Sequence, residues 1–158
     1  MACDKIDYFR SLSFMTKQEI IHSMERVTYE KDHLLCRKDE IADKMFVIQD
    51  GIVEVACSYA PKIEQQFIIE RLGRGAIINH RSFMLKDDAD TDFRCLTTVS
   101  CFVLTVEKIE SIRDKKSDMK KAFGEVEKEV FQPKWPLALD YIFHNNDEKD
   151  YAQTLRKN

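Results

Sequence analysis

The sequence predicts an α+β fold in which an antiparallel β-roll is flanked by N-terminal and C-terminal helices. Between residues 27 and 106, short segments rich in β-branched and aromatic residues alternate with turn residues. This pattern is typical of a barrel or sandwich and not of a parallel sheet. Apolar residues at helical spacing precede and follow these segments. We therefore expect N-terminal helices over residues 1–26, the roll over residues 27–106 and C-terminal helices over residues 107–158.

The N-terminal segment carries a helix-start pattern. Thr16 is followed three residues later by Glu19, which is the spacing of a capping box. Ile20, Ile21 and Met24 then supply an apolar stripe at helical spacing. We expect a helix that begins at Thr16.

Within the roll, one dipeptide predicts a tight turn. Asp50 and Gly51 lie between two strand-like runs, and Asp-Gly is a strong signal for a two-residue hairpin. We expect these two runs to pair as a hairpin, with Met45 and Phe46 in the core.

The C-terminal segment has one apolar helical face and then a break. The residues of the face are Ile109, Ile112, Met119, Phe123, Val126 and Val130. Pro133 and Pro136 interrupt the pattern before a second apolar stretch over residues 137–143. Because an isolated helix does not keep such a face exposed to water, we expect the tail to fold back over the roll. The alternative is pairing with another chain.

Composition and charge exclude several classes of protein. The chain has 158 residues and a net charge of −3, which argues against nucleic acid as a partner. No apolar run approaches the roughly 20 residues of a spanning helix, so we expect no direct membrane insertion by this segment. The five cysteines are scattered and the four histidines lack metal-ligand spacing. We expect reduced thiols in a cytoplasmic protein and no metal site.

Residues 35–55 resemble the signature of cyclic-nucleotide-binding domains. Phe46, Ile48 and Gly51 match that signature, whereas Asp39 and Glu40 stand where the family has Gly-Asp. Residues 72–75 (Leu-Gly-Arg-Gly) are similar to the entry of the family's phosphate-binding cassette. The resemblance implies a double-stranded β-helix of the jelly-roll type. It also implies cyclic AMP or cyclic GMP as the candidate ligand and no other cofactor.

A finer resemblance concerns residues 74–80 and 136–142, which are similar to the cytosolic domains of ciliate cyclic-nucleotide-gated or voltage-gated potassium-type channels. It implies a non-catalytic regulatory domain on the cytosolic face of a membrane. Its partners would be the transmembrane region of the parent channel or sister subunits.

The family's cassette is altered in this chain. The family holds the cyclic phosphate with a short helix and an arginine, and the ribose hydroxyl with a glutamate. Here Ile78, Asn79 and His80 occupy the Phe-Gly-Glu positions, and a neutral histidine is a poorer acceptor than a carboxylate. Asn79 is also a good N-cap residue, so a short helix is expected to begin there.

The arginine of the cassette is displaced. Arg94 is the arginine of the returning strand, but Thr91 stands at the family's arginine position. An offset of three residues turns a side chain to the opposite face of a strand, unless a bulge in residues 86–91 brings Arg94 back. The loop over residues 86–92 also carries four carboxylates, which repel an anion.

The candidate cassette is therefore degenerate, and we expect no binding of cyclic AMP or cyclic GMP in the usual way. Its residues are Gly75, Ile78, Asn79, His80, Arg81, Arg94 and Cys95. The alternative function is a standalone interaction or scaffold protein built on the same roll, with residues 134–136 (Lys-Trp-Pro) as a contact. A cupin-type enzyme would need clustered histidines. A regulator of the catabolite-activator type would need a longer, more basic C-terminal part.

Overall fold

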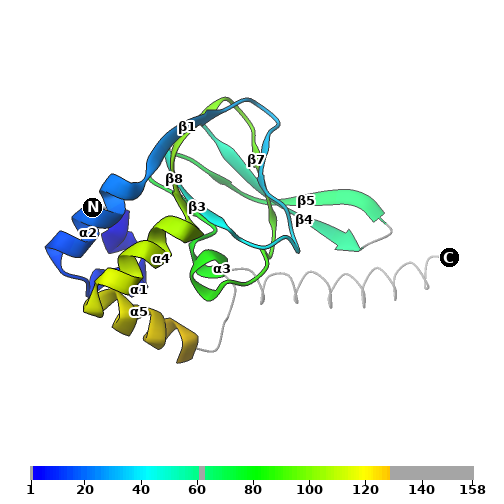
Figure 1. Ribbon diagram of the computed structural model, residues 1–158. Helices are drawn as coiled ribbons and strands as arrows, with labels where there is room; N and C mark the ends of the chain where they lie inside the picture. The colour runs from blue at the N-terminus through cyan, green and yellow to red at the C-terminus, as the bar shows by residue number, and fades with distance from the viewer. Residues whose placement is uncertain (1, 61–62, 129–158) are drawn as a thin grey trace.

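A computed structural model describes residues 2–60 and 63–128, in which helices gather on one side of a β-roll (Figure 1). The helices are η1 (Ala2–Lys5), α1 (Asp7–Arg10), α2 (Phe14–Ser23), α3 (His80–Leu85), α4 (Val106–Lys115) and α5 (Ser117–Lys128). The strands are β1 (Glu25–Tyr29), β2 (Leu34–Cys36), β3 (Lys44–Asp50), β4 (Val53–Ala60), β5 (Ile63–Leu72), β6 (Ile77–Ile78), β7 (Asp92–Cys95) and β8 (Val99–Thr105). In this part of the chain, no helix is long and apolar enough to cross a membrane.

The strands form two antiparallel four-stranded sheets, in the orders β1-β8-β3-β6 and β2-β7-β4-β5. This confirms the predicted fold class. A cluster that we call the roll core contains side chains from both sheets. Its buried members are Phe46, Ile48, Val53, Val55, Ile78, Phe93, Cys95, Val99, Cys101 and Val103. The expected burial of Met45 and Phe46 is also confirmed.

The predicted hairpin at Asp50 and Gly51 is wrong. Strand β3 pairs with β8 and β6, whereas β4 pairs with β5 and β7, so this turn carries the chain from one sheet to the other. The turn itself is tight: Gly51 has φ +96°, and a Cβ at this position would lie 2.4 Å from the carbonyl oxygen of Thr98. Local turn chemistry fixes the reversal, but long-range pairing with β8 decides which strands become neighbours.

The predicted capping box is also wrong. Helix α2 begins at Phe14, and the hydroxyl of Ser13 caps it by accepting from the Thr16 N–H at 3.2 Å. The Thr16 hydroxyl instead donates to the Asp118 carboxylate, at 2.9 Å from Oδ2. Glu19 does not fold back on the helix start but pairs with Lys116 at 3.3 Å. Both polar groups bind distant partners, which sequence spacing does not reveal.

The C-terminal segment forms two helices, because Lys116 adopts an extended conformation between α4 and α5. Ile109 and Ile112 of α4 and Met119 and Phe123 of α5 are all buried by this chain. The side chain of Val126 and all residues from 129 onwards, including Val130, Pro133, Pro136 and 137–143, lie outside the described residues. The fold-back of that tail stays a prediction.

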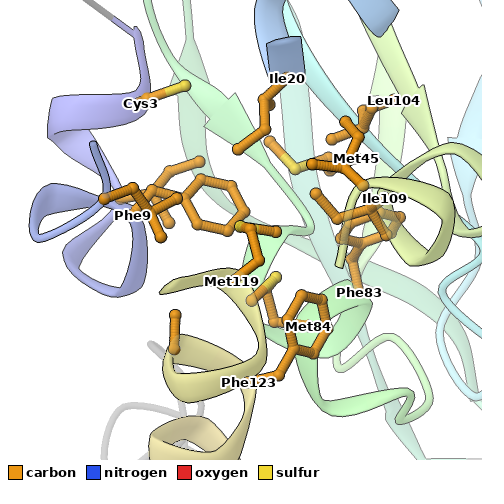
Figure 2. Close-up of a cluster of buried hydrophobic side chains, with 14 of the residues drawn as sticks. Cys3, Phe9, Ile20, Met45, Phe83, Met84, Leu104, Ile109, Met119 and Phe123 are labelled. Atoms are coloured by element: carbon orange, nitrogen blue, oxygen red, sulfur yellow. The ribbon is translucent and has the colours of Figure 1, made fainter. Parts of the chain in front are cut away.

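The helices share one cluster, which we call the helical core, on the outer face of the β1-β8-β3-β6 sheet (Figure 2). Met45 and Leu104 face it from β3 and β8, whereas their neighbours Phe46 and Val103 point into the roll core. The sheet is thus buried on both faces. The labelled helical residues are Cys3, Phe9, Ile20, Phe83, Met84, Ile109, Met119 and Phe123. The N-terminal helices, α3 and the C-terminal helices therefore pack as one unit.

A polar contact joins α5 to the start of α2. The Asp118 carboxylate accepts hydrogen bonds from the Ser13 N–H at 3.0 Å, the Thr16 hydroxyl and the Met119 N–H at 3.0 Å. Burial alone would raise the pKa of Asp118, but these hydrogen bonds outweigh it and hold the pKa below its ordinary value of 3.8. A lowered folded-state pKa stabilises the fold above the unfolded pKa, and this contribution is lost as the pH falls through the folded pKa.

We predict that Asp118→Asn lowers the free energy of unfolding by about 1 kcal/mol at pH 7, because two helix starts lose a charged acceptor. Denaturant titrations at pH 7 and at stepwise lower pH would measure this. The difference in unfolding free energy from the wild type should narrow as the pH falls from the ordinary aspartate pKa of 3.8 through the lower pKa of folded Asp118, because the wild-type carboxyl then becomes protonated. Asp114→Asn on α4, whose side chain is 68% exposed, is the control and should change little. If the two proteins differ in unfolding free energy by the same amount at every pH, the contact of Asp118 with α2 does not depend on its charge.

Candidate functional site

The candidate site is a hollow between α3 and the roll. Its walls are the side chains of Val55, Leu72, Ile77, Asn79, His80, Arg81, Ser82, Asp90 and Phe93. The cavity volume is about 60 Å³, whereas pockets that enclose drug-sized ligands have volumes of about 300–1,000 Å³. The lining is mostly apolar and includes one cation and one carboxylate.

Helix α3 begins where the sequence predicted, but Asn79 does not cap it with its side chain. Asn79 has φ +68°, in the left-handed region that asparagine tolerates better than most residues. This conformation explains why a glycine position of the resembled cassette is filled by asparagine. Its side-chain Nδ2 donates to the Lys44 carbonyl at 3.2 Å. Its Oδ1 is buried and has no hydrogen-bond partner among the described residues.

Two opposite charges line the hollow, Arg81 from α3 and Asp90 from the loop before β7. Burial raises the pKa of Asp90 above its ordinary value of 3.8. Its own backbone N–H, the Thr91 hydroxyl and the positive charge of Arg81 partly oppose this increase. The carboxylate is therefore desolvated and stabilised by only a few local groups.

The acidic loop is held in place by its backbone. The Ala89 N–H donates to the Glu40 carbonyl at 2.8 Å, and the Asp39 N–H donates to the Ala89 carbonyl at 2.8 Å. Asp39 has φ +66°, which fits its place in the altered Gly-Asp turn. The side chains of Asp87 and Asp88 are exposed, whereas Asp90 is partly buried. The loop thus presents one of its carboxylates to the hollow.

Residues 26–116 match the family model of the cyclic nucleotide-binding domain. This chain belongs to that family. Among curated proteins, no sequence matches the chain.

Solved structures agree with this fold. The N-terminal domain of a transcriptional regulator from Streptomyces coelicolor A3(2) is similar, with a TM-score of 0.66, 17% identity and coverage of 80% of this chain and 87% of that chain. A cyclic nucleotide-binding-like protein from Brucella abortus gives a TM-score of 0.63 and 16% identity, over 72% of this chain and 95% of that chain. At such identities the likeness concerns the fold alone.

In this cyclic-nucleotide-binding domain, Arg94 lies on strand β7, as expected, but outside the hollow. Its neighbours Phe93 and Cys95 are buried in the roll core, so Arg94 points to the opposite face of the sheet. There its Nη2 lies 3.4 Å from Oε2 of Glu54. Thr91 is fully buried and shares the inward side with Phe93. The register of β7 with β4 shows no shift, so Arg94 keeps this outward orientation.

Arg94 instead neutralises a buried carboxylate. The Glu54 side chain is only 4% exposed, and Arg71 Nε lies 3.4 Å from its second oxygen. Both arginines are cross-strand partners of Glu54 in the register of β4 with β7 and β5. A carboxylate removed from water needs such partners, so the role that these contacts give Arg94 is structural.

The remaining residues of the predicted cassette have different places. Asn79, His80 and Arg81 line the hollow. Gly75 has φ +84° and donates from its N–H to the Ile48 carbonyl at 2.8 Å, and Ile78 and Cys95 are buried in the roll core. The sequence pattern does not identify Ser82, Asp90 or the apolar lining residues as part of the site. For Asp90 a signal exists in the sequence, because its acidic loop follows the cassette residues.

We predict that Arg94→Gln lowers the free energy of unfolding by about 1 kcal/mol, because Glu54 keeps only the partly exposed Arg71 as its cation. Arg74→Gln, at an exposed position on the turn after β5, is the matched control and should leave stability nearly unchanged. Thermal and urea unfolding would measure both variants. A loss of equal size in both would show that net charge, and not the pair with Glu54, is responsible.

Proposed function

We propose that this chain is a non-catalytic regulatory domain with a degenerate phosphate-binding cassette, and that it forms the cytosolic part of an ion channel. The observation that carries the regulatory role is the shared helical core. Phe83 and Met84 of the cassette helix α3 pack in the same cluster as Met119 and Phe123 of α5. A rearrangement of α3 therefore changes the packing surface of the C-terminal helices.

Polar contacts support the same coupling. Lys86, directly after α3, pairs with Glu110 of α4 at 2.5 Å. Lys116, between α4 and α5, pairs with Glu19 of α2 at 3.3 Å. These ion pairs connect the cassette with the C-terminal helices and those helices with the N-terminal ones. A ligand or partner acts through such a network only by preferring one of two arrangements.

Three features support a degenerate cassette. The hollow is small, the family's arginine position is Thr91, and the histidine at position 80 replaces a carboxylate acceptor. Arg94 cannot substitute for the missing arginine while it pairs with Glu54 on the outer face. Cyclic AMP or cyclic GMP is accordingly not bound in the usual way.

The channel assignment rests on the likeness of residues 74–80 and 136–142 to ciliate potassium-type channels. Its partners are the transmembrane region of the parent channel or sister subunits, at the cytosolic face of a membrane. The acidic net charge of −3 disfavours nucleic acid as a partner.

The second candidate is a standalone interaction or scaffold protein. It is favoured by two adjacent apolar side chains at the start of α2, Phe14 and Met15, which are 66% and 70% exposed. Neighbouring exposed apolar residues are typical of protein contact sites. A scaffold needs no coupling between α3 and α5, which separates the two candidates experimentally.

We predict that Met84→Ala increases amide hydrogen exchange of α5 (Ser117–Lys128) more than exchange in the sheets, because it removes packing between α3 and α5. Ile48→Ala, in the roll core, is the control, because each substitution is expected to lower the free energy of unfolding by about 2–5 kcal/mol. Exchange followed by mass spectrometry would compare the two variants. Relative to global stability, the protection of α5 amides from exchange could be the same in both variants. In that case the scaffold candidate is favoured and the regulatory proposal fails.

The channel context has its own test. We expect the native protein, detected with an antibody against this chain, to sediment with membranes and to stay there after alkaline carbonate extraction. Extraction releases peripheral proteins, whereas a chain connected to spanning helices remains. A protein recovered entirely in the soluble fraction would contradict the channel and support the standalone alternative.

A further inference from the structure

We propose that the carboxylate of Asp90 occupies the hollow in place of an anionic ligand, so that this domain supplies its own anion to Arg81. The proposal rests on the degenerate cassette proposed above and specifies how the site is regulated. The ligand class that competes with Asp90 is a small molecule with one phosphate charge.

The first support is that two opposite charges belong to the lining of one small cavity. Arg81 lies in the first turn of α3 and Asp90 in the loop before β7, and both line the hollow. Arg81 is among the groups that favour the ionised form of Asp90. In a site that binds a phosphate, the anion near such a cation would come from the ligand. Here the chain itself provides it.

The second support is that hydrogen bonds on both sides of Asp90 hold its loop in place. Ala89, next to Asp90, exchanges hydrogen bonds with residues 39–40, and the Ala42 N–H donates to the Asp87 carbonyl at 3.2 Å. On the other side, the Lys38 N–H donates to Oδ1 of Asp92 at 2.7 Å. Asp90 is thus fixed from both sides in its partly buried position.

The third support is the small volume of the hollow. A cavity volume of about 60 Å³ is too small to enclose a whole nucleotide, so only a part such as the phosphate could enter. A phosphate-bearing ligand would meet the Asp90 carboxylate at short range, where two like charges repel strongly because the site is partly desolvated. Binding therefore requires that Asp90 leave the hollow or become protonated.

Proton binding and anion binding are consequently linked at this site. The groups that act on Asp90 are Arg81 of α3 and Asp87 and Thr91 of its own loop, and His80 also lines the hollow. Because burial raises the pKa of Asp90, protonation occurs closer to neutral pH than for an exposed aspartate. Anion affinity should rise as the pH falls, and this rise should be absent when Asp90 is replaced.

Calorimetric titration with cyclic AMP tests the proposal, since its phosphodiester keeps one charge over the whole pH range used. Asp90→Ala opens space and removes the charge, and Asp90→Asn removes only the charge. Asp88→Asn is the matched control, because it changes net charge equally from an exposed position on the same loop. We expect both Asp90 variants to bind at least about tenfold more tightly than the wild type. Adding Arg81→Gln should abolish the gain, and Asp88→Asn should show none.

The outcomes separate this inference from the proposed function. Micromolar binding of cyclic AMP by the wild type would overturn the degenerate cassette itself. Weak wild-type binding with no gain in either Asp90 variant, each shown by its thermal transition to be folded, would overturn the self-occupied hollow and leave the degenerate cassette standing. An equal gain in Asp88→Asn would also overturn it, because net charge would then explain the effect.

Discussion

The structure depends above all on the burial of one continuous hydrophobic cluster on the outer face of the β1-β8-β3-β6 sheet. Met45 and Leu104 form its floor, and Phe9, Phe83 and Met119 bring the N-terminal helices, the cassette helix and α5 onto it. None of these short helices is long enough to be stable alone in water. Their stability comes from this shared packing, and so a change at one helix affects the others.

Polar groups complete this arrangement where the helices and strands end. Asp118 binds the start of α2 as well as its own helix, and the pair of Lys86 with Glu110 connects α3 to α4. These contacts contribute less than the apolar burial, since most are partly exposed. They do fix the relative register of the helices, because each joins a particular pair of residues across the core.

The hollow beside α3 and the outer face of the β2-β7-β4-β5 sheet illustrate how strand alternation distributes charge. Along β7, Phe93 and Cys95 face the roll, so Arg94 faces outward, where it neutralises the buried Glu54. The inward side beside Phe93 is left with the uncharged Thr91. The charged groups that line the hollow come from elsewhere, Arg81 from α3 and Asp90 from the loop.

The sequence by itself determined the fold class and most of the strands, because alternation, turn residues and the family signature are local patterns that mark where strands and turns occur. It also predicted that Thr91 and Arg94 face opposite sides of a regular strand, but only the register of β7 with β4 showed that Arg94 is the outward one. Tertiary structure decided what depends on distant partners. Thr16 and Glu19 have the spacing of a capping box but bind Asp118 and Lys116, which lie about a hundred residues further along the chain. Asp50 and Gly51 form a turn between sheets, because β3 pairs with β8, which lies much later in the sequence, and not with β4. Asp90 became a residue of the hollow only because the backbone of its loop pairs with residues 39–42. Such contacts follow from the packing of the whole chain, and no window of sequence contains both of their members.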